Sequence, residues 1–123
     1  MPARGRLVPW SRERRDAYGA YAGLLVEFRQ AMLHHWFCVH QGRDAENEVA
    51  LRARSFETRS SAQQALFRLQ LITDDTGPGS AAVDAFTAVG AIDRAQDLPE
   101  LVTRRDASRE LIDAFVANAR RCV

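Results

Sequence analysis

The sequence predicts an all-α protein, an antiparallel four-helix bundle with a long first helix and an irregularity in the second. Apolar residues recur at the spacing of amphipathic helices through most of the 123 residues. No segment shows the alternation of apolar and polar residues that a half-buried strand requires. Short turn-like segments separate the helical stretches, and short connections place neighbouring helices antiparallel. We expect a single domain over residues 10–123, preceded by a flexible N-terminal arm over residues 1–9.

The first predicted helix is the longest. It begins near Ser11, a residue type suited to capping, and ends near His40 before Gly42, which is placed as a C-terminal cap. About 28 residues give a length of about 42 Å. Its apolar stripe consists of Ala17, Tyr21, Leu24, Leu25, Phe28, Met32, His35, Trp36 and Val39. A short third helix cannot cover all of this stripe, so either the second helix or another subunit has to shield it.

The second predicted helix spans residues 44–74 and has two apolar sides. Val49, Ala53 and Phe56 form one stripe, which Phe67 and Leu71 continue. After Thr58, further apolar residues lie on roughly the opposite side: Ala62, Leu66 and Leu69. Either the helix is buried on both sides or it kinks near residues 58–61, where Ser60–Gln63 also matches a capping box. We expect a nearly continuous helix with an irregularity at this point.

Two shorter elements follow the loop predicted over Asp74–Gly79. Ser80 is expected to cap the third helix, and Asp97–Glu100 matches a capping box at the start of the fourth. We place five phenylalanines in the core because each falls on an apolar stripe: Phe28, Phe56, Phe67, Phe86 and Phe115. The up-and-down topology also separates Cys38 from Cys122 beyond the roughly 7 Å Cα limit of a disulfide, so two free thiols are predicted.

Composition excludes several classes of function. The net charge of +1 supplies no strong field toward nucleic acid or anionic lipid, so neither is an expected partner. The sequence contains no phosphate-binding or dinucleotide glycine motif, no CxxC and no HExxH. The most apolar segment carries Glu27 and Arg29 at its centre, which argues against a membrane span. No secretory signal is recognisable. We expect a cytoplasmic protein without a cofactor.

The segment HHWFCVH, residues 34–40, contains every histidine of the chain and one of its two cysteines. His34 and Cys38 are four residues apart and can meet on one helix face, so a metal site at these two residues is one hypothesis. Metal sites of this kind usually need three or four protein ligands, and no spacing in the sequence selects the missing ones. The alternative is a hydrophobic helix end plugged by aromatic side chains.

The segment Arg29–His34 has the form R-x4-H and resembles the catalytic motif of HEPN-type ribonucleases, which are also helical bundles and usually dimers. The resemblance covers six residues and lies in the first helix, whereas HEPN proteins usually carry the motif in a late helix. It implies that Arg29 contacts a phosphate and that His34 acts as general acid or base. A ribonuclease using Arg29 and His34 is therefore the alternative enzymatic function.

A second resemblance concerns the two ends of the chain. The segment Trp10–Tyr18, with its Trp, Arg-Arg and Tyr pattern, and the segment Phe115–Arg121 are similar to a group of small, mostly helical actinobacterial proteins of unknown role. The resemblance covers the ends well and the middle loosely. It implies a helical fold and a bacterial cytoplasmic setting, and it transfers no catalytic residue.

The function predicted first is a helical protein-interaction or assembly module without catalytic activity. Bundle-forming patterns are plentiful, and no set of polar residues converges on a site. The long apolar stripe of the first helix favours self-association as a homodimer, or binding of a protein partner. Tyr18, Met32 and Trp36 lie toward one edge of that stripe and are the expected contact residues. If the second helix covers the stripe, this reason for a dimer disappears.

Overall fold

The computed structural model describes residues 2–73 and 77–122, with side chains described from residue 12 onward. In these ranges it contains no strand and four α-helices: α1 (Pro2–Gln41), α2 (Glu48–Ile72), α3 (Pro78–Gly90) and α4 (Leu98–Arg121). Two short 3-10 helices, η1 (Ala45–Asn47) and η2 (Ala91–Arg94), precede α2 and follow α3. The predicted all-α class and the helical-bundle architecture are confirmed.

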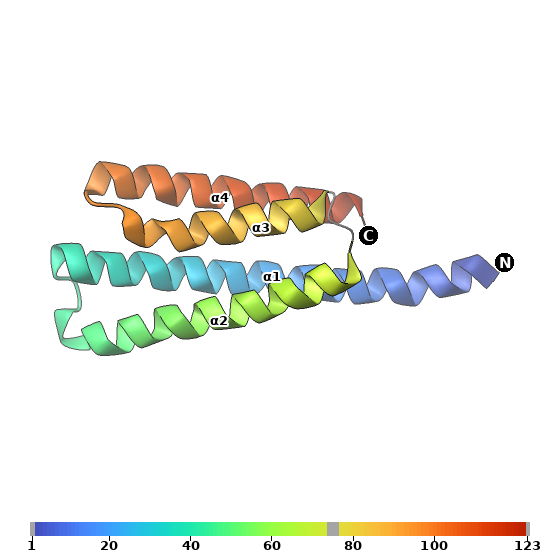
Figure 1. The fold of residues 1–123 in the computed structure, drawn as a ribbon, viewed down its shortest axis with the longest axis horizontal. Helices are drawn as coiled ribbons and strands as arrows, with labels where there is room; N and C mark the ends of the chain where they lie inside the picture. Colours follow the sequence, from blue (N-terminus) through green and yellow to red (C-terminus); the bar gives the residue numbers. More distant parts are fainter. Residues whose placement is uncertain (1, 74–76, 123) are drawn as a thin grey trace.

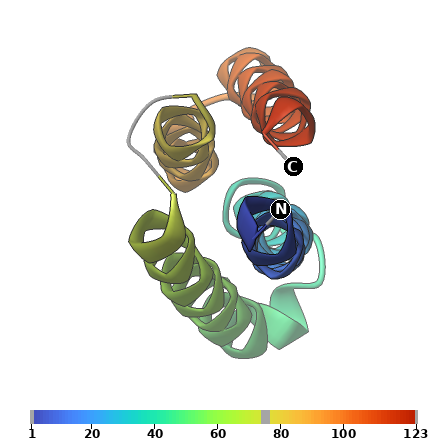
Figure 2. The ribbon, with the colours of Figure 1, turned by 90° about the vertical axis from the view of Figure 1, so that its right-hand side faces the viewer.

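The helices form an uneven bundle around α1 (Figure 1). Helix α1 packs mainly against α2, and α3 packs mainly against α4. Seen end-on, α2 and α4 lie on opposite sides of the bundle, and α2 crosses the others obliquely (Figure 2). Helix α2 therefore presents one side to α1 and α3 and leaves the other side uncovered.

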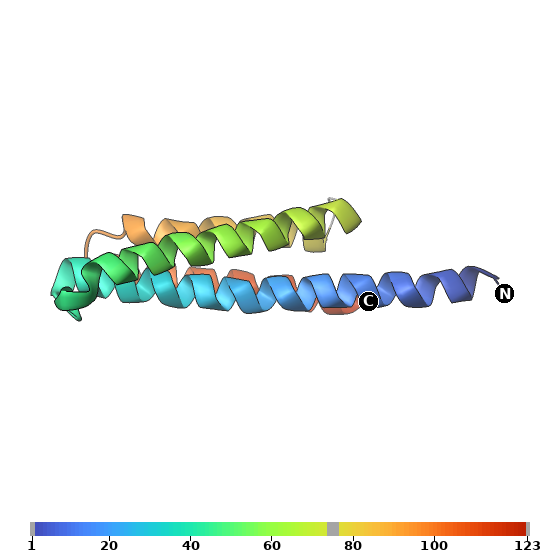
Figure 3. The same cartoon turned by 90° about the horizontal axis from the view of Figure 1, so that it is seen from below.

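Helix α1 begins at Pro2, so the backbone of residues 2–9 is helical, and the flexibility expected for the N-terminal arm over residues 1–9 stays a prediction. Pro2 stands in the first turn, where its missing N–H is tolerated. The amino-terminal part of α1 extends past the ends of the other helices (Figure 3). At the other end, Gly42 has a φ of 72° and its N–H donates to the Cys38 carbonyl at 3.1 Å. This is the left-handed C-terminal cap predicted from the sequence.

Helix α2 is continuous, so the irregularity predicted near residues 58–61 is wrong. Two polar side chains bond back to their own helix. Ser55 Oγ donates to the Arg52 carbonyl at 2.7 Å, and Thr58 Oγ1 lies 2.8 Å from the Arg54 carbonyl. Because these bonds satisfy the hydroxyls, Ser55 and Thr58 can occupy buried positions without breaking the helix. The shift of the apolar pattern near Thr58 reflects two helix faces and not a kink.

The start of α4 follows its predicted capping residue, whereas Ser80 lies inside α3 and no side chain caps that helix. Helix α3 begins at Pro78, two residues before the expected cap Ser80, because proline at the first position is already in helical φ. Residues 74–76 of the predicted loop lie outside the described residues. The capping box before α4 is confirmed, since the Glu100 N–H donates to Asp97 Oδ1 at 2.9 Å and Glu100 Oε2 accepts from the Gln96 N–H at 3.1 Å. The hydrogen bond from the Gln96 N–H and the contact with Arg104 lower the pKa of Glu100.

The core runs along α1 and receives side chains from every other helix. Its largest fully buried members are Tyr21, Leu25, Phe28, Leu69, Val89, Ile92, Leu101 and Phe115. Phe28 and Phe115 are buried and Phe86 packs against Phe28, as predicted. Phe56 and Phe67 are exposed, so their assignment to the core is wrong.

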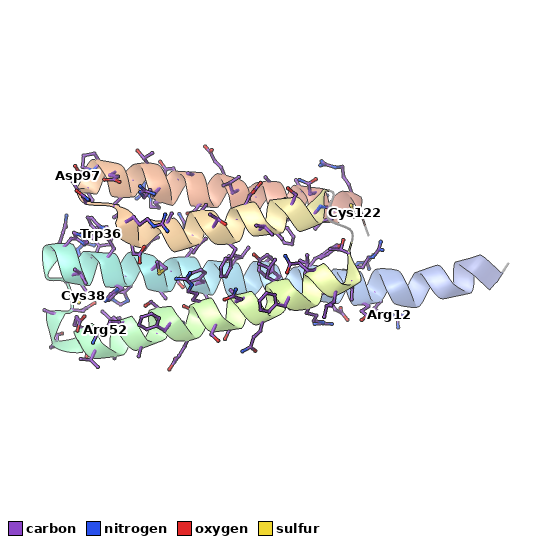
Figure 4. The ribbon with its side chains drawn as sticks, in the orientation of Figure 1. Arg12, Trp36, Cys38, Arg52, Asp97 and Cys122 are labelled. Atoms are coloured by element: carbon purple, nitrogen blue, oxygen red, sulfur yellow. The ribbon has the colours of Figure 1, made fainter. Side chains whose placement is uncertain are left out.

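Both cysteines are free thiols, as predicted, and Figure 4 shows them at opposite ends of the bundle. Cys122 is exposed, whereas Cys38 is buried. Burial raises the pKa of the Cys38 thiol, and the nearby carboxylates of Glu48, Asp44 and Glu46 add to the effect. Because thiolates are the reactive form, Cys38 is protected by both exclusion and charge.

We therefore expect Ellman's reagent at pH 8 to modify Cys122 at once and Cys38 at least tenfold more slowly, until denaturant opens the chain. The Cys122→Ser variant should retain only the slow phase. Two equally fast phases in the native protein would contradict the burial of Cys38, and a monomer mass lower by two hydrogens would contradict both free thiols and the topology.

Candidate functional site

The three histidines of HHWFCVH point to three different partners. His34 Nε2 lies 2.7 Å from Asp44 Oδ2, in the turn after α1. His35 Nε2 lies 3.6 Å from Glu48 Oε1 at the start of α2. The ring of His40 stacks on Trp36, with centroids 4.3 Å apart. His34 and His35 thus link the end of α1 to the turn and to α2, whereas His40 contacts its own helix, and the three do not converge on a common point.

The metal hypothesis at His34 and Cys38 finds no further ligands in the part of the chain whose side chains the structure describes. The Cys38 sulfur is buried and lies 3.8 Å from the Asp44 carbonyl oxygen, while His34 is bonded to the Asp44 carboxylate. Among the residues that the structure describes, no group of three or more His, Cys, Asp or Glu side chains is arranged to hold a metal ion. These contacts are those of a helix end tied to its turn.

Arg29 and His34 face different parts of the molecule. Arg29 Nε donates to Ser108 Oγ at 2.9 Å, and its Nη2 donates to the Arg105 carbonyl at 3.1 Å, so its guanidinium is bound to α4. Burial lowers the pKa of Arg29, and the nearby charges of Arg109 and Arg105 lower it further. His34 lies about 140° further round the helix and bonds to the turn. In this structure Arg29 thus contacts α4 and His34 contacts the turn after α1, and the ribonuclease hypothesis stays a prediction.

Tyr18, Met32 and Trp36, the predicted contact residues, are only 4%, 6% and 2% exposed. The other helices of the same chain cover this stripe, since Tyr18 meets Phe115 of α4 edge-to-face and all three residues belong to the core cluster. Tyr18 also donates from its hydroxyl to Thr73 Oγ1, and Trp36 Nε1 donates to the Ala95 carbonyl, both at 2.8 Å. These side chains hold the bundle together, and the choice of them as an interface is corrected.

Four exposed large apolar residues lie together on the outer side of α2, whereas those on the other helices are Val26, Val39, Val83, Leu98 and Val116. Val49 is 72% exposed, Phe56 64%, Phe67 55% and Leu71 85%. At about 100° per residue these four share one face, opposite the buried side of the helix. We call this face the α2 stripe and define it by the following residues: Val49, Ala53, Phe56, Ser60, Gln64, Phe67 and Leu71. Its periodicity is visible in the sequence, but periodicity does not say which of two apolar faces turns inward.

A cavity of about 340 Å³ lies between α2 and the α3–η2 segment. It is lined by Arg59, Phe86, Thr87, Gly90, Asp93 and Arg94. Asp93 partly offsets the two arginine charges, and no pair of lining residues forms a nucleophile with a base. The cavity offers polar surface without an arrangement for catalysis.

The comparisons place the chain in a family. Residues 15–123 match the family model described as KilB plasmid transfer protein. No curated protein and no solved structure matches the chain. Among the described residues, none of the helices combines the length and the apolar character needed to cross a bilayer. Because the family model spans nearly all of the bundle, this chain belongs to the KilB plasmid transfer protein family.

Proposed function

We propose that this protein serves plasmid transfer as a helical interaction module without catalytic activity, and that the α2 stripe is its contact surface. The family membership supports the process. The single observation that carries the mode of action is the row of four large apolar side chains exposed on one face of α2. Soluble chains rarely leave such a row in water unless it binds something.

The contact is of the helix-against-helix kind. In such complexes another helix or a hydrophobic groove binds the regularly spaced apolar side chains of a helix. The two phenylalanines are the strongest anchors, since aromatic side chains contribute most to interface free energy. We propose a homodimer as the form of this contact, which keeps the self-association predicted from the sequence while moving it from α1 to α2.

The setting of this function is proposed to be the cytoplasm of a bacterium, in keeping with the resemblance to actinobacterial proteins. Two free cysteines, one of them exposed, suit a reducing compartment. The exposed Cys122 would be open to oxidation elsewhere.

Plasmid transfer measured in a host that lacks the chromosomal or plasmid copy of this gene tests the proposal. Complementation with Phe56→Ser/Phe67→Ser should lower transfer frequency roughly tenfold or more, because both aromatic anchors are lost. The matched control is Val26→Ser/Val39→Ser, which removes two similarly exposed apolar side chains from α1. The control should transfer normally.

Both variants should keep their helix content and melting temperature, since all four positions are exposed. Normal transfer by Phe56→Ser/Phe67→Ser at ordinary protein levels would overturn the role of the α2 stripe. An equal loss in the α1 control would also overturn it, because the effect would then not be specific to α2.

A further inference from the structure

We infer that the α2 stripe binds the α2 stripe of a second copy of this chain, with the two helices antiparallel and related by a two-fold axis at Ser60. This inference rests on the proposed function and specifies its partner. It is carried by three properties of the stripe: the matching of large and small residues about Ser60, the charges along one flank, and the apolar area that two copies would bury.

The residues of the stripe are self-complementary in size. In an antiparallel pair centred on Ser60, positions equally distant from Ser60 face each other. Phe67 then faces Ala53 of the second copy, Leu71 faces Val49, and Ser60 faces Ser60 at the axis. Large against small is the arrangement that lets two helices approach closely. Phe56 faces Gln64, whose methylene groups can lie along the ring.

A parallel alignment lacks this match. Each residue would face itself, so Phe56 would meet Phe56 while Ala53 met Ala53 and Ser60 met Ser60. The phenylalanines would hold the helices apart at the positions where small residues leave gaps, and poorly filled contacts forfeit dispersion energy. The stripe therefore favours the antiparallel pair.

The flanking charges are complementary in the same register. Glu57 and Arg68 are exposed on one flank of the stripe. A two-fold axis places this flank beside its own copy, so Glu57 of each chain lies about 7.5 Å along the axis from Arg68 of the other. Side chains on a helix lean toward its amino terminus, so these two lean toward each other in the antiparallel pair. On the other flank, Arg59 lines the cavity toward α3 and so turns away from the axis.

The area is sufficient for a specific contact. A phenylalanine side chain offers roughly 200 Å², so the exposed parts of Phe56 and Phe67 amount to about 240 Å² in each copy. Val49 and Leu71, which are still more exposed, bring the total for two copies to about 1,000 Å², which is near the lower bound for a specific interface. A dimer that forms at micromolar concentration is expected.

Cysteine cross-linking on the full chain tests the geometry. In the Cys122→Ser background, where Cys38 remains buried, Ser60→Cys should form a disulfide-linked dimer under mild oxidation, because two residues at the axis come within disulfide reach. Ser61→Cys is the matched control, an adjacent exposed serine that lies about 100° round the helix from Ser60. Ala53→Cys is the control for direction, since the two copies of residue 53 lie about 21 Å apart in the antiparallel pair.

Cross-linking of Ser60→Cys, with little from Ser61→Cys and Ala53→Cys, is the expected result. Strong cross-linking of Ala53→Cys would overturn the antiparallel register. A monomer mass in sedimentation equilibrium up to 100 μM, with no cross-linking of Ser60→Cys, would overturn the second copy as the occupant. If Phe56→Ser/Phe67→Ser nevertheless abolished plasmid transfer, the proposed function would survive and the partner would be a different protein.

Charge reversal provides an independent test of the register. Arg68→Glu alone should weaken dimerisation severalfold at low salt, because the new carboxylate faces Glu57 of the second copy. The double variant Glu57→Arg/Arg68→Glu should restore dimerisation, since the two opposite charges are again paired. The reversal of Glu110, exposed on α4, is the control and should leave the dimer unchanged. Failure of the double variant to recover would overturn the pairing of Glu57 with Arg68.

Discussion

Replacing Phe115 by alanine is expected to lower the free energy of unfolding by about 3–5 kcal/mol, the range for truncating a fully buried phenylalanine. Its ring is inaccessible to solvent and meets Tyr21 edge-to-face at 5.3 Å and Tyr18 at 6.1 Å. Each aromatic contact stabilises the fold beyond the effect of the buried area. The loss of free energy therefore includes both ring contacts and the cost of the cavity left behind. Chemical denaturation monitored by circular dichroism measures the change.

The matched control is Phe67→Ala, which makes the same chemical change on the exposed side of α2. It should change the free energy of unfolding by less than about 0.5 kcal/mol, as is usual at exposed positions, when measured at concentrations where the chain is monomeric. Equal losses for Phe115→Ala and Phe67→Ala would mean that the two faces of α2 are assigned wrongly. A free energy of unfolding for Phe115→Ala equal to that of the wild type would contradict the burial of Phe115 in the core.

Replacing Trp36 by alanine is expected to cost a similar amount, about 3–5 kcal/mol. Trp36 joins the carboxyl end of α1 to the segment before α4, because its Nε1 donates to the Ala95 carbonyl at 2.8 Å. The same ring stacks on His40 and meets Phe37 edge-to-face at 5.3 Å. For a chain of this size the melting temperature should fall by on the order of 10 °C or more.

Trp36→Phe separates the two contributions of this side chain. It keeps most of the apolar volume but leaves the buried Ala95 carbonyl without its donor, which should cost about 1–3 kcal/mol. Calorimetry of the two variants and the wild type provides the comparison. A melting temperature for Trp36→Ala equal to that of the wild type would mean that Trp36 is not buried within the single chain, and would reopen its earlier assignment to a contact between copies.

The helices and their ends could be read from the sequence because local chemistry sets them. Gly42 adopts the positive φ that its position predicted, and Asp97 caps α4 through the Glu100 N–H. Apolar spacing was enough to predict an all-α chain and a core around Phe28 and Phe115. Such features depend on residues within one or two turns of one another, so they are encoded locally.

The candidate site could be predicted less well. The sequence placed the contact surface on α1, at Tyr18, Met32 and Trp36, because the short third helix could not cover that stripe. All three are buried within the single chain, in the core to which every helix contributes. Likewise, the short strings around His34 suggested a metal or a catalytic pair, but spacing alone does not tell which neighbours a side chain meets after folding.

By itself, the sequence determined that the chain is helical, where most of its helices end, and that α2 carries two apolar faces. Only the tertiary structure decided which face turns inward. The face with Ala62, Leu66 and Leu69 is buried because it includes small residues that let α2 approach α1 closely, with Ser55 and Thr58 satisfied by their own helix. The bulkier face with Phe56 and Phe67 therefore remained outside, since a helix packed mainly on one neighbour has only one side to bury.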